Sequence, residues 1–79
     1  MPTLPDDDEW LLHERRAIGD RIRVTRITQG RTQESVFLAA RVARSTYQHI
    51  EAGTADGRIG TLMRIARVLG VHVTDLLRG

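Results

Sequence analysis

The chain has 79 residues, 41% hydrophobic and only 4% aromatic, so it forms one domain near the lower size limit for unaided folding and lacks room for a large ligand-enclosing cavity. It contains no cysteine, which excludes disulfides and cysteine-ligated zinc and predicts an intracellular protein. All twelve basic residues are arginines that follow residue 14, while five of the ten acids precede them; the rest of the chain is cationic, as expected of a surface that meets a polyanion.

The first residues differ from the rest in composition. Residues 1–8 hold two prolines and three aspartates and offer little to bury, so we expect a flexible acidic N-terminal tail followed by one domain over residues 9–79. The tail lacks the basic start and apolar run of a secretory signal, and no stretch approaches the roughly 20 apolar residues of a membrane span. The sequence therefore predicts a cytoplasmic protein with no membrane contact.

The first predicted helix runs from Trp10 to a stop at Gly30. Apolar residues recur along it at steps of three and four, with arginines between them. These apolar positions are Trp10, Leu11, Ala17, Ile18 and Ile22, with Thr25 as a further candidate.

The next two predicted helices are short and close together. Thr32 has the side chain of an N-cap, and Arg41 and Val42 form a turn that leads to a third helix over residues 43–51. The buried stripe of the second helix is predicted to consist of Val36, Phe37, Ala39 and Ala40.

The rest of the chain predicts two more helices. Glycines at 53, 57 and 60 mark a loop and a helix start, and the fourth helix stops at Gly70. Without strand alternation or a repeat, the whole pattern predicts an all-α fold of five helices. The fourth helix carries Ile59, Leu62, Ile65, Ala66 and Leu69 on one side, and Val71, Val73, Leu76 and Leu77 form a final short helix that closes the core.

The two short helices suggest a function. Helices of about two turns are not stable alone. Joined by a three- or four-residue turn, they would cross steeply as a helix-turn-helix, with the second helix presented outward. A projection of the third helix groups Ala43, Tyr47 and Ile50 on the packing side. The opposite side carries groups suited to hydrogen-bonding base edges, although an ordinary solvated face remains the alternative: Arg44, Ser45, Gln48 and His49.

Residues 18–77 resemble the helix-turn-helix domain of the phage Cro and repressor proteins, often called XRE-type. The stretches that carry the resemblance are "IGDRIRVTR", "TQE", "VARSTYQHIEAG" and "LMRIARVLGVHVTDLL", which follow one another in the family's order over about three quarters of the chain. The resemblance implies a lambda-repressor-like fold of five helices.

The resemblance also implies roles for particular residues. Arg26 and Glu51 match a structural ion pair between the first and third helices. The base-reading positions are Arg44, Ser45, Gln48 and His49, and the positions that contact the DNA backbone are Thr32, Gln33, Thr46 and Arg58.

Four positions depart from the family's pattern. Arg41 replaces a glycine in the turn and would have to adopt a left-handed conformation or distort the turn. Ala43 replaces a Ser or Thr cap, at a cost of about 1 kcal/mol. Arg31 and Thr25 replace apolar residues; Arg31 and Arg41 are either solvated surface residues or added phosphate ligands.

Other kinds of site find no support. His13, His49 and His72 are too scattered for a metal cluster, and no nucleophile with a paired base is visible, so we expect neither a metal, a cofactor nor an enzyme. Trp10 and Leu11 precede the family's first helix. Trp10 either covers the last helix near Leu76, or joins Leu11 and Leu76 in a symmetric homodimer contact that forms at least on DNA.

These features together predict a sequence-specific double-stranded DNA-binding transcriptional regulator, most simply a repressor that occupies a promoter. The first alternative is an antitoxin whose main role is to mask a toxin, with DNA binding as autoregulation. A second is the N-terminal domain of a larger regulator.

Overall fold

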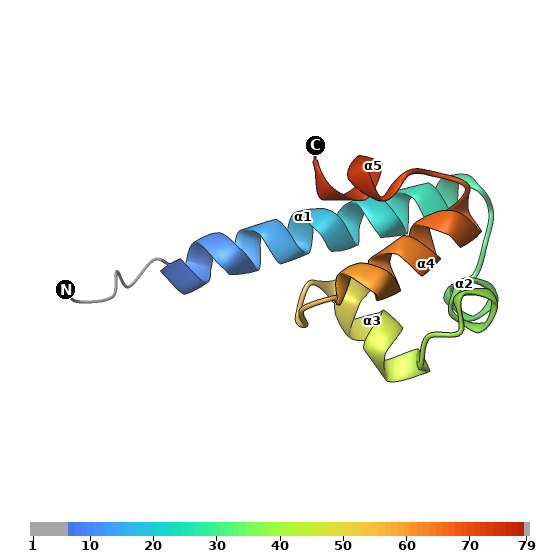
Figure 1. Cartoon of the computed structure of the whole chain (residues 1–79), viewed down its shortest axis with the longest axis horizontal. Coiled ribbons are helices and arrows are strands. Elements are labelled where there is room, and N and C mark those ends of the chain that lie inside the picture. Colours follow the sequence, from blue (N-terminus) through green and yellow to red (C-terminus); the bar gives the residue numbers. More distant parts are fainter. Residues whose placement is uncertain (1–6, 79) are drawn as a thin grey trace.

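The computed structural model describes residues 7–78, which form five helices and no strand (Figure 1). The all-α, five-helix prediction is confirmed. No helix in this part of the chain is both long and apolar enough to cross a bilayer. The helices are α1 (Asp7–Thr28), α2 (Gln33–Ala40), α3 (Arg44–Ala52), α4 (Ile59–Leu69) and α5 (Val73–Leu77).

The longest helix, α1, begins earlier than the sequence predicted. Its first residue is Asp7, so Asp7 and Asp8 belong to the helix and not to the tail; the tail's residues 1–6 lie outside the described range. Acidic residues at a helix start face the positive end of the helix dipole, which favours this extension. The first turns of α1 project beyond the other helices (Figure 1).

The ends of the two short helices follow the predictions made for Thr32, Arg41 and Ala43. The Thr32 hydroxyl accepts a hydrogen bond from the Ser35 amide (3.0 Å) at the start of α2. Arg41 ends α2 with φ 58° and ψ 45°, the left-handed conformation that its place in the turn required. At the start of α3, Ala43 makes no side-chain cap hydrogen bond, as expected of alanine. The turn therefore has helix-turn-helix geometry although two of its residues are unfavourable for it.

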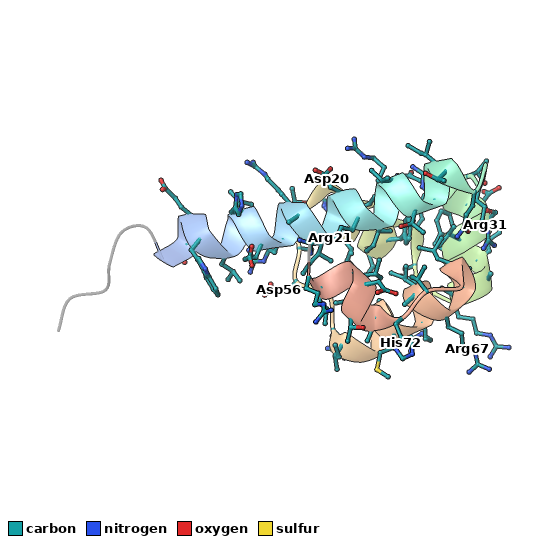
Figure 2. All side chains as sticks on the ribbon, turned by 90° about the horizontal axis from the view of Figure 1, so that it is seen from above. Asp20, Arg21, Arg31, Asp56, Arg67 and His72 are labelled. Carbon is teal, nitrogen blue, oxygen red and sulfur yellow. The ribbon has the colours of Figure 1, made fainter. Side chains whose placement is uncertain are left out.

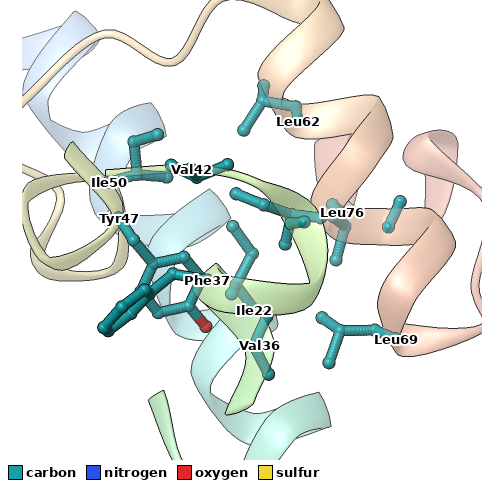
Figure 3. Close-up of a cluster of buried hydrophobic side chains, with 12 residues drawn as sticks. Ile22, Val36, Phe37, Val42, Tyr47, Ile50, Leu62, Leu69 and Leu76 are labelled. Carbon is teal, nitrogen blue, oxygen red and sulfur yellow. The ribbon is translucent and has the colours of Figure 1, made fainter. Parts of the chain in front are cut away.

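The core lies where all five helices meet (Figure 3). Four residues that the sequence placed in packed positions are exposed instead, namely Ala39, Ala43, Ile59 and Leu77. Ala43 is the N-cap residue of α3, and Ile59 is the first residue of α4. The buried apolar residues are Ile22, Val36, Phe37, Ala40, Val42, Tyr47, Ile50, Leu62, Ile65, Ala66, Leu69 and Leu76.

Two glycines let α1 and α3 approach closely. A Cβ on Gly19 would lie 2.7 Å from the Ile50 carbonyl oxygen, and a Cβ on Gly53 would lie 2.7 Å from the Arg16 Cα. Gly53 also has φ 77°, a conformation that favours glycine. Any larger residue at either position would push α3 away from α1.

The C-terminal end of α4 has all four of its last carbonyls satisfied. The amides of Val71 and Gly70 bond the first two, on Ala66 and Arg67, at 3.0 and 3.1 Å. The last two, on Val68 and Leu69, accept from the side chains of Arg31 (2.7 Å) and Gln29 (2.6 Å). Arg31 is therefore neither a solvated surface residue nor a free phosphate ligand; its cation anchors the α1–α2 loop to the negative end of α4.

Candidate nucleic-acid interface

The third helix separates its two faces as its sequence predicted. Tyr47 and Ile50 are buried on a helix that packs against α1 and α2, with the Tyr47 and Phe37 rings 6.1 Å apart between centroids (Figure 3). The side chains that project into solvent are Arg44, Ser45, Gln48 and His49. No part of the described chain covers this surface, which leaves it open to a groove of DNA.

Behind this surface, an ion pair holds α3 to α1. Arg26 donates through Nη2 and Nε to the two carboxylate oxygens of Glu51, at 2.7 and 3.1 Å, and through Nη1 to the Arg31 carbonyl. The pair is buried, with 13% of the Arg26 and 4% of the Glu51 side chain exposed. A bidentate pair of this kind fixes orientation as well as distance.

The environment of Glu51 keeps it ionised. Burial by itself would raise the pKa of Glu51, but hydrogen bonds from Arg26 and Gln33 outweigh it and lower the pKa below its ordinary value of 4.5. The Tyr47 hydroxyl lies beside this carboxylate but outside hydrogen-bonding geometry. Burial and the adjacent negative charge raise the pKa of Tyr47, so this phenol stays neutral.

Gln33 connects the buried pair to the exposed face. Its Nε2 donates to Glu51 Oε1 (3.1 Å), and its Oε1 accepts from Gln48 Nε2 (3.4 Å). A chain of hydrogen bonds therefore runs from α1 through Glu51 and Gln33 to a base-reading candidate on α3. This chain orients Gln48 before any ligand arrives, which lowers the entropy cost of binding.

Arg44 has partners that the sequence did not suggest. Its Nη2 donates to Glu34 Oε2 (3.1 Å), and its guanidinium lies 5.4 Å from the centre of the Phe37 ring. The Arg44 and Glu34 side chains are 63% and 62% exposed. Exposed pairs contribute about 0–1 kcal/mol, so a base edge can replace Glu34 at little cost. The acid and the arginine are ten residues apart on different helices, and no local pattern pairs them.

The remaining candidates on α3 are oriented to different degrees. His49 Nδ1 lies 2.9 Å from the Thr54 hydroxyl, which itself donates to the His49 carbonyl at 3.3 Å. The contact with Thr54 holds the His49 ring at the C-terminal end of α3. The side chains of Ser45 and Thr46 are exposed and have no hydrogen-bond partner among residues 7–78.

The backbone-contact candidates lie at two helix starts. Thr32 and Gln33 open α2, whose free amides form a positive helix end. Arg58 occupies the cap position of α4, is exposed, and has no side-chain partner in the described part of the chain. In the same loop Asp56 pairs with Arg15 of α1, whose guanidinium holds the pKa of this carboxyl below its usual value. Sequence reasoning missed this pair, which ties the loop to α1.

Residues 22–76 match the protein-family model described as helix-turn-helix. The chain belongs to this family. The expected XRE-type, Cro/repressor-like relationship is confirmed, and the chain is a DNA-binding domain of the helix-turn-helix class.

Two solved structures resemble this helix-turn-helix chain, each with 22% sequence identity and a TM-score of 0.78. One is the restriction-modification controller protein C.AhdI from Aeromonas hydrophila, with 81% of this chain and 97% of the other covered. The second is a hypothetical transcription factor, NHTF, from Neisseria, with 99% and 85% covered. At this identity the likeness shows the fold, which is lambda-repressor-like. No curated protein matches the chain.

The dimer candidates do not lie together on the helix-turn-helix surface. Trp10 is 67% exposed, so it does not cover the last helix, and Leu76 is 1% exposed within the core of its own chain. Leu76 is therefore unavailable for a contact between subunits. Leu11 is half-buried and lines a small hollow of about 130 Å³ between α1 and the loop before α4.

Metal ligands do not gather on the domain either. Within residues 7–78, no three side chains of His, Asp or Glu lie close enough to hold a metal ion.

Proposed function

We propose that this helix-turn-helix protein binds a specific sequence of double-stranded DNA through the outward face of α3 and regulates transcription, as a repressor that occupies a promoter. The observation that carries the proposal is the uncovered polar face of α3, a helix that is held in place from behind. Side chains that bind a ligand need a rigid support, and the hydrogen bonds among Arg26, Glu51 and Gln33 supply one.

The side chains on this face match the donors and acceptors of the major groove. Arg44 can donate two hydrogen bonds to O6 and N7 of guanine, and Gln48 can donate to N7 and accept from N6 of adenine. Ser45 and His49 can each donate or accept a single hydrogen bond at either base. We assign the DNA backbone to Thr32, Gln33, Thr46 and Arg58, since phosphate contacts set the register from which bases are read.

Similar structures support a regulatory role. One is of a restriction-modification controller protein and the other of a hypothetical transcription factor. We extend a regulatory role from these two proteins to this chain, and take transcription as the regulated process from the second.

Selection of bound duplexes from a random pool tests the proposal. We expect enrichment of one short motif, with an affinity that falls by about 0.9 logarithmic units per logarithmic unit of salt for each phosphate contacted. Placing the selected motif over a promoter should block transcription in a purified system. Recovery of duplexes without a shared motif would contradict sequence-specific binding.

We propose further that the protein forms a homodimer on DNA, through Trp10 and Leu11 on the projecting turns of α1. Exposed aromatic side chains are common at protein interfaces. Two copies would place their α3 helices in half-sites about 34 Å apart. Sedimentation at high micromolar concentration, with and without the selected duplex, should show a dimer that Trp10→Ser weakens. A monomer in both conditions would contradict dimerisation.

The exposure of Trp10 also favours a second candidate function, that of an antitoxin whose α1 masks a toxin. Co-expression with the product of an adjacent gene separates the two. A stable complex that inhibits the partner's activity and is lost in Trp10→Ser would support the antitoxin. An effect of Trp10→Ser on self-association alone would support the dimeric regulator.

A further inference from the structure

A hollow of about 520 Å³ lies on a surface outside the proposed base-reading face. It is open between the C-terminal end of α2 and the outer side of α4. Three apolar residues line it, Ala39, Ala40 and Val68, together with three arginines that we call its rim, Arg41, Arg64 and Arg67.

The positive charge of this rim has no compensation nearby. No carboxylate lines the hollow, and α4 contains no acidic residue over its whole length. The one acid of α2, Glu34, stands in the first turn of that helix and bonds Arg44. Arg31 adds a further cation at the same end of the molecule, where Figure 2 shows Arg31 and Arg67 opposite the start of α1.

Only one of the three rim arginines has a bond that serves the fold. Arg64 donates through Nε to the Ala40 carbonyl (3.1 Å), so it satisfies the end of α2 and is held over the hollow. The side chains of Arg41 and Arg67 have no hydrogen-bond partner in the described range. They differ in this from Arg26 and Arg31, which bond a carboxylate and a carbonyl inside the domain.

Arg41 occupies its position at a conformational cost. Among residues 7–78 it is the one non-glycine residue with a positive φ, at 58°. A glycine there would be free of the strain, and three other helix ends in this protein do use glycine. An arginine at such a position indicates a use for its side chain, because strain persists where function requires it.

We propose that Arg41, Arg64 and Arg67 form a phosphate-binding site whose ligand is a backbone phosphate of the DNA, outside the segment read by α3. Guanidinium groups bind phosphate oxygens bidentately, and an open basic hollow suits an oxyanion better than an apolar ligand. Arg41 stands three residues before Arg44, so the site adjoins the start of α3. This inference rests on the proposed function for the source of the phosphate.

The test uses a variant that removes the two unbonded arginines and keeps Arg64, which serves the fold. Arg41→Gly relieves the left-handed strain, so R41G/R67Q should melt no lower than the wild type. The matched control R23Q/R78Q removes two exposed arginines from other surfaces. A lower melting temperature of R41G/R67Q would contradict the strain argument.

Binding is measured on the selected motif in two lengths, one covering the motif alone and one longer by a helical turn at each end. The wild type should bind the longer duplex about tenfold more tightly, because one charge-assisted hydrogen bond raises affinity by about this factor. R41G/R67Q should lose this gain and about 0.9 of the logarithmic salt slope on the longer duplex. Its affinity for the short duplex should match that of the control variant.

Equal losses of affinity in R41G/R67Q and R23Q/R78Q, or no effect of duplex length in the wild type, would contradict a site for a phosphate of the flanking DNA.

A second experiment, with pyrophosphate, does not depend on DNA. Pyrophosphate should raise the melting temperature of the wild type and not that of R41G/R67Q. Pyrophosphate protection without a length effect would assign the site to a free phosphorylated ligand. Protection by a polyglutamate peptide and not by pyrophosphate would assign it to an acidic protein segment and overturn the phosphate site. Failure of the wild type to select any duplex would instead contradict the proposed function.

Discussion

The two faces of α3 each hold an arginine–carboxylate pair, and the two pairs differ chiefly in their access to water. On the inward side, Glu51 and Arg26 are buried and joined at two points. On the outward side, Arg44 and Glu34 meet at one point and are more than half exposed. Burial makes the first pair part of the scaffold. Exposure leaves the second pair free to exchange its partner for a ligand.

The largest effect expected from this comparison is on stability. Glu51→Ala should destabilise the domain by about 3–5 kcal/mol, because it leaves the Arg26 charge buried without its carboxylate. Glu34→Ala is the matched control and should change the unfolding free energy by less than about 1 kcal/mol. Urea unfolding of both variants measures the difference. Equal losses would mean that burial does not distinguish the two pairs.

A second prediction concerns the support of α3 by α1. Gly53→Ala and Gly70→Ala each place a Cβ on a left-handed residue, at a cost of about 1–2 kcal/mol. Only Gly53→Ala also forces a contact, with the Arg16 backbone, and overpacking adds about 1–3 kcal/mol. The melting temperature of Gly53→Ala should therefore lie well below that of Gly70→Ala. The reverse order would contradict the close approach of α1 and α3.

Acid should weaken the inward face of α3 through protonation of Glu51. The folded state holds the pKa of Glu51 below its ordinary value of 4.5, so the ionised form stabilises the fold above that pH. This stability is lost as the pH falls through the lowered pKa of the folded state. Melting temperatures between pH 7 and pH 3 should fall more steeply for the wild type than for Glu51→Gln. Parallel curves would show that Glu51 has the same pKa in both states.

The smallest effect concerns the start of α3. Ala43→Ser supplies the missing cap and should stabilise the domain by up to about 1 kcal/mol, because a serine hydroxyl can accept from a free amide of the first turn. Leu38→Ser, on an exposed side chain away from any cap, serves as control. A rise in melting temperature for Ala43→Ser alone is the predicted result. No rise would mean that the turn already satisfies these amides.

Local patterns predicted most of the fold. The three- and four-residue spacing of apolar residues, the Thr32 cap and the glycines at helix ends gave five helices with nearly the observed limits. The left-handed conformation of Arg41 is one of the two outcomes that the family resemblance implied for its place in the turn. These features depend on residues near one another in sequence, which is why one chain was enough.

The contacts and burial that the sequence did not predict share one cause. The Arg15–Asp56 pair and the Arg31–Val68 bond join residues far apart in sequence, and no periodicity encodes them. Trp10 and Leu76 are both apolar, yet Trp10 is exposed and Leu76 is buried. Trp10 lies on the first turns of α1, which project beyond the other helices (Figure 1), whereas Leu76 lies in the core. Tertiary placement, and not residue type, decided these positions.

The most direct test of the outward face is random-pool selection repeated with two arginine variants. Arg44→Ala should lose preference at one base position, worth about 1–3 kcal/mol, while Arg58→Ala should keep the whole motif and bind every sequence more weakly. An unchanged motif in Arg44→Ala, with equal losses on selected and random DNA, would contradict base reading by α3.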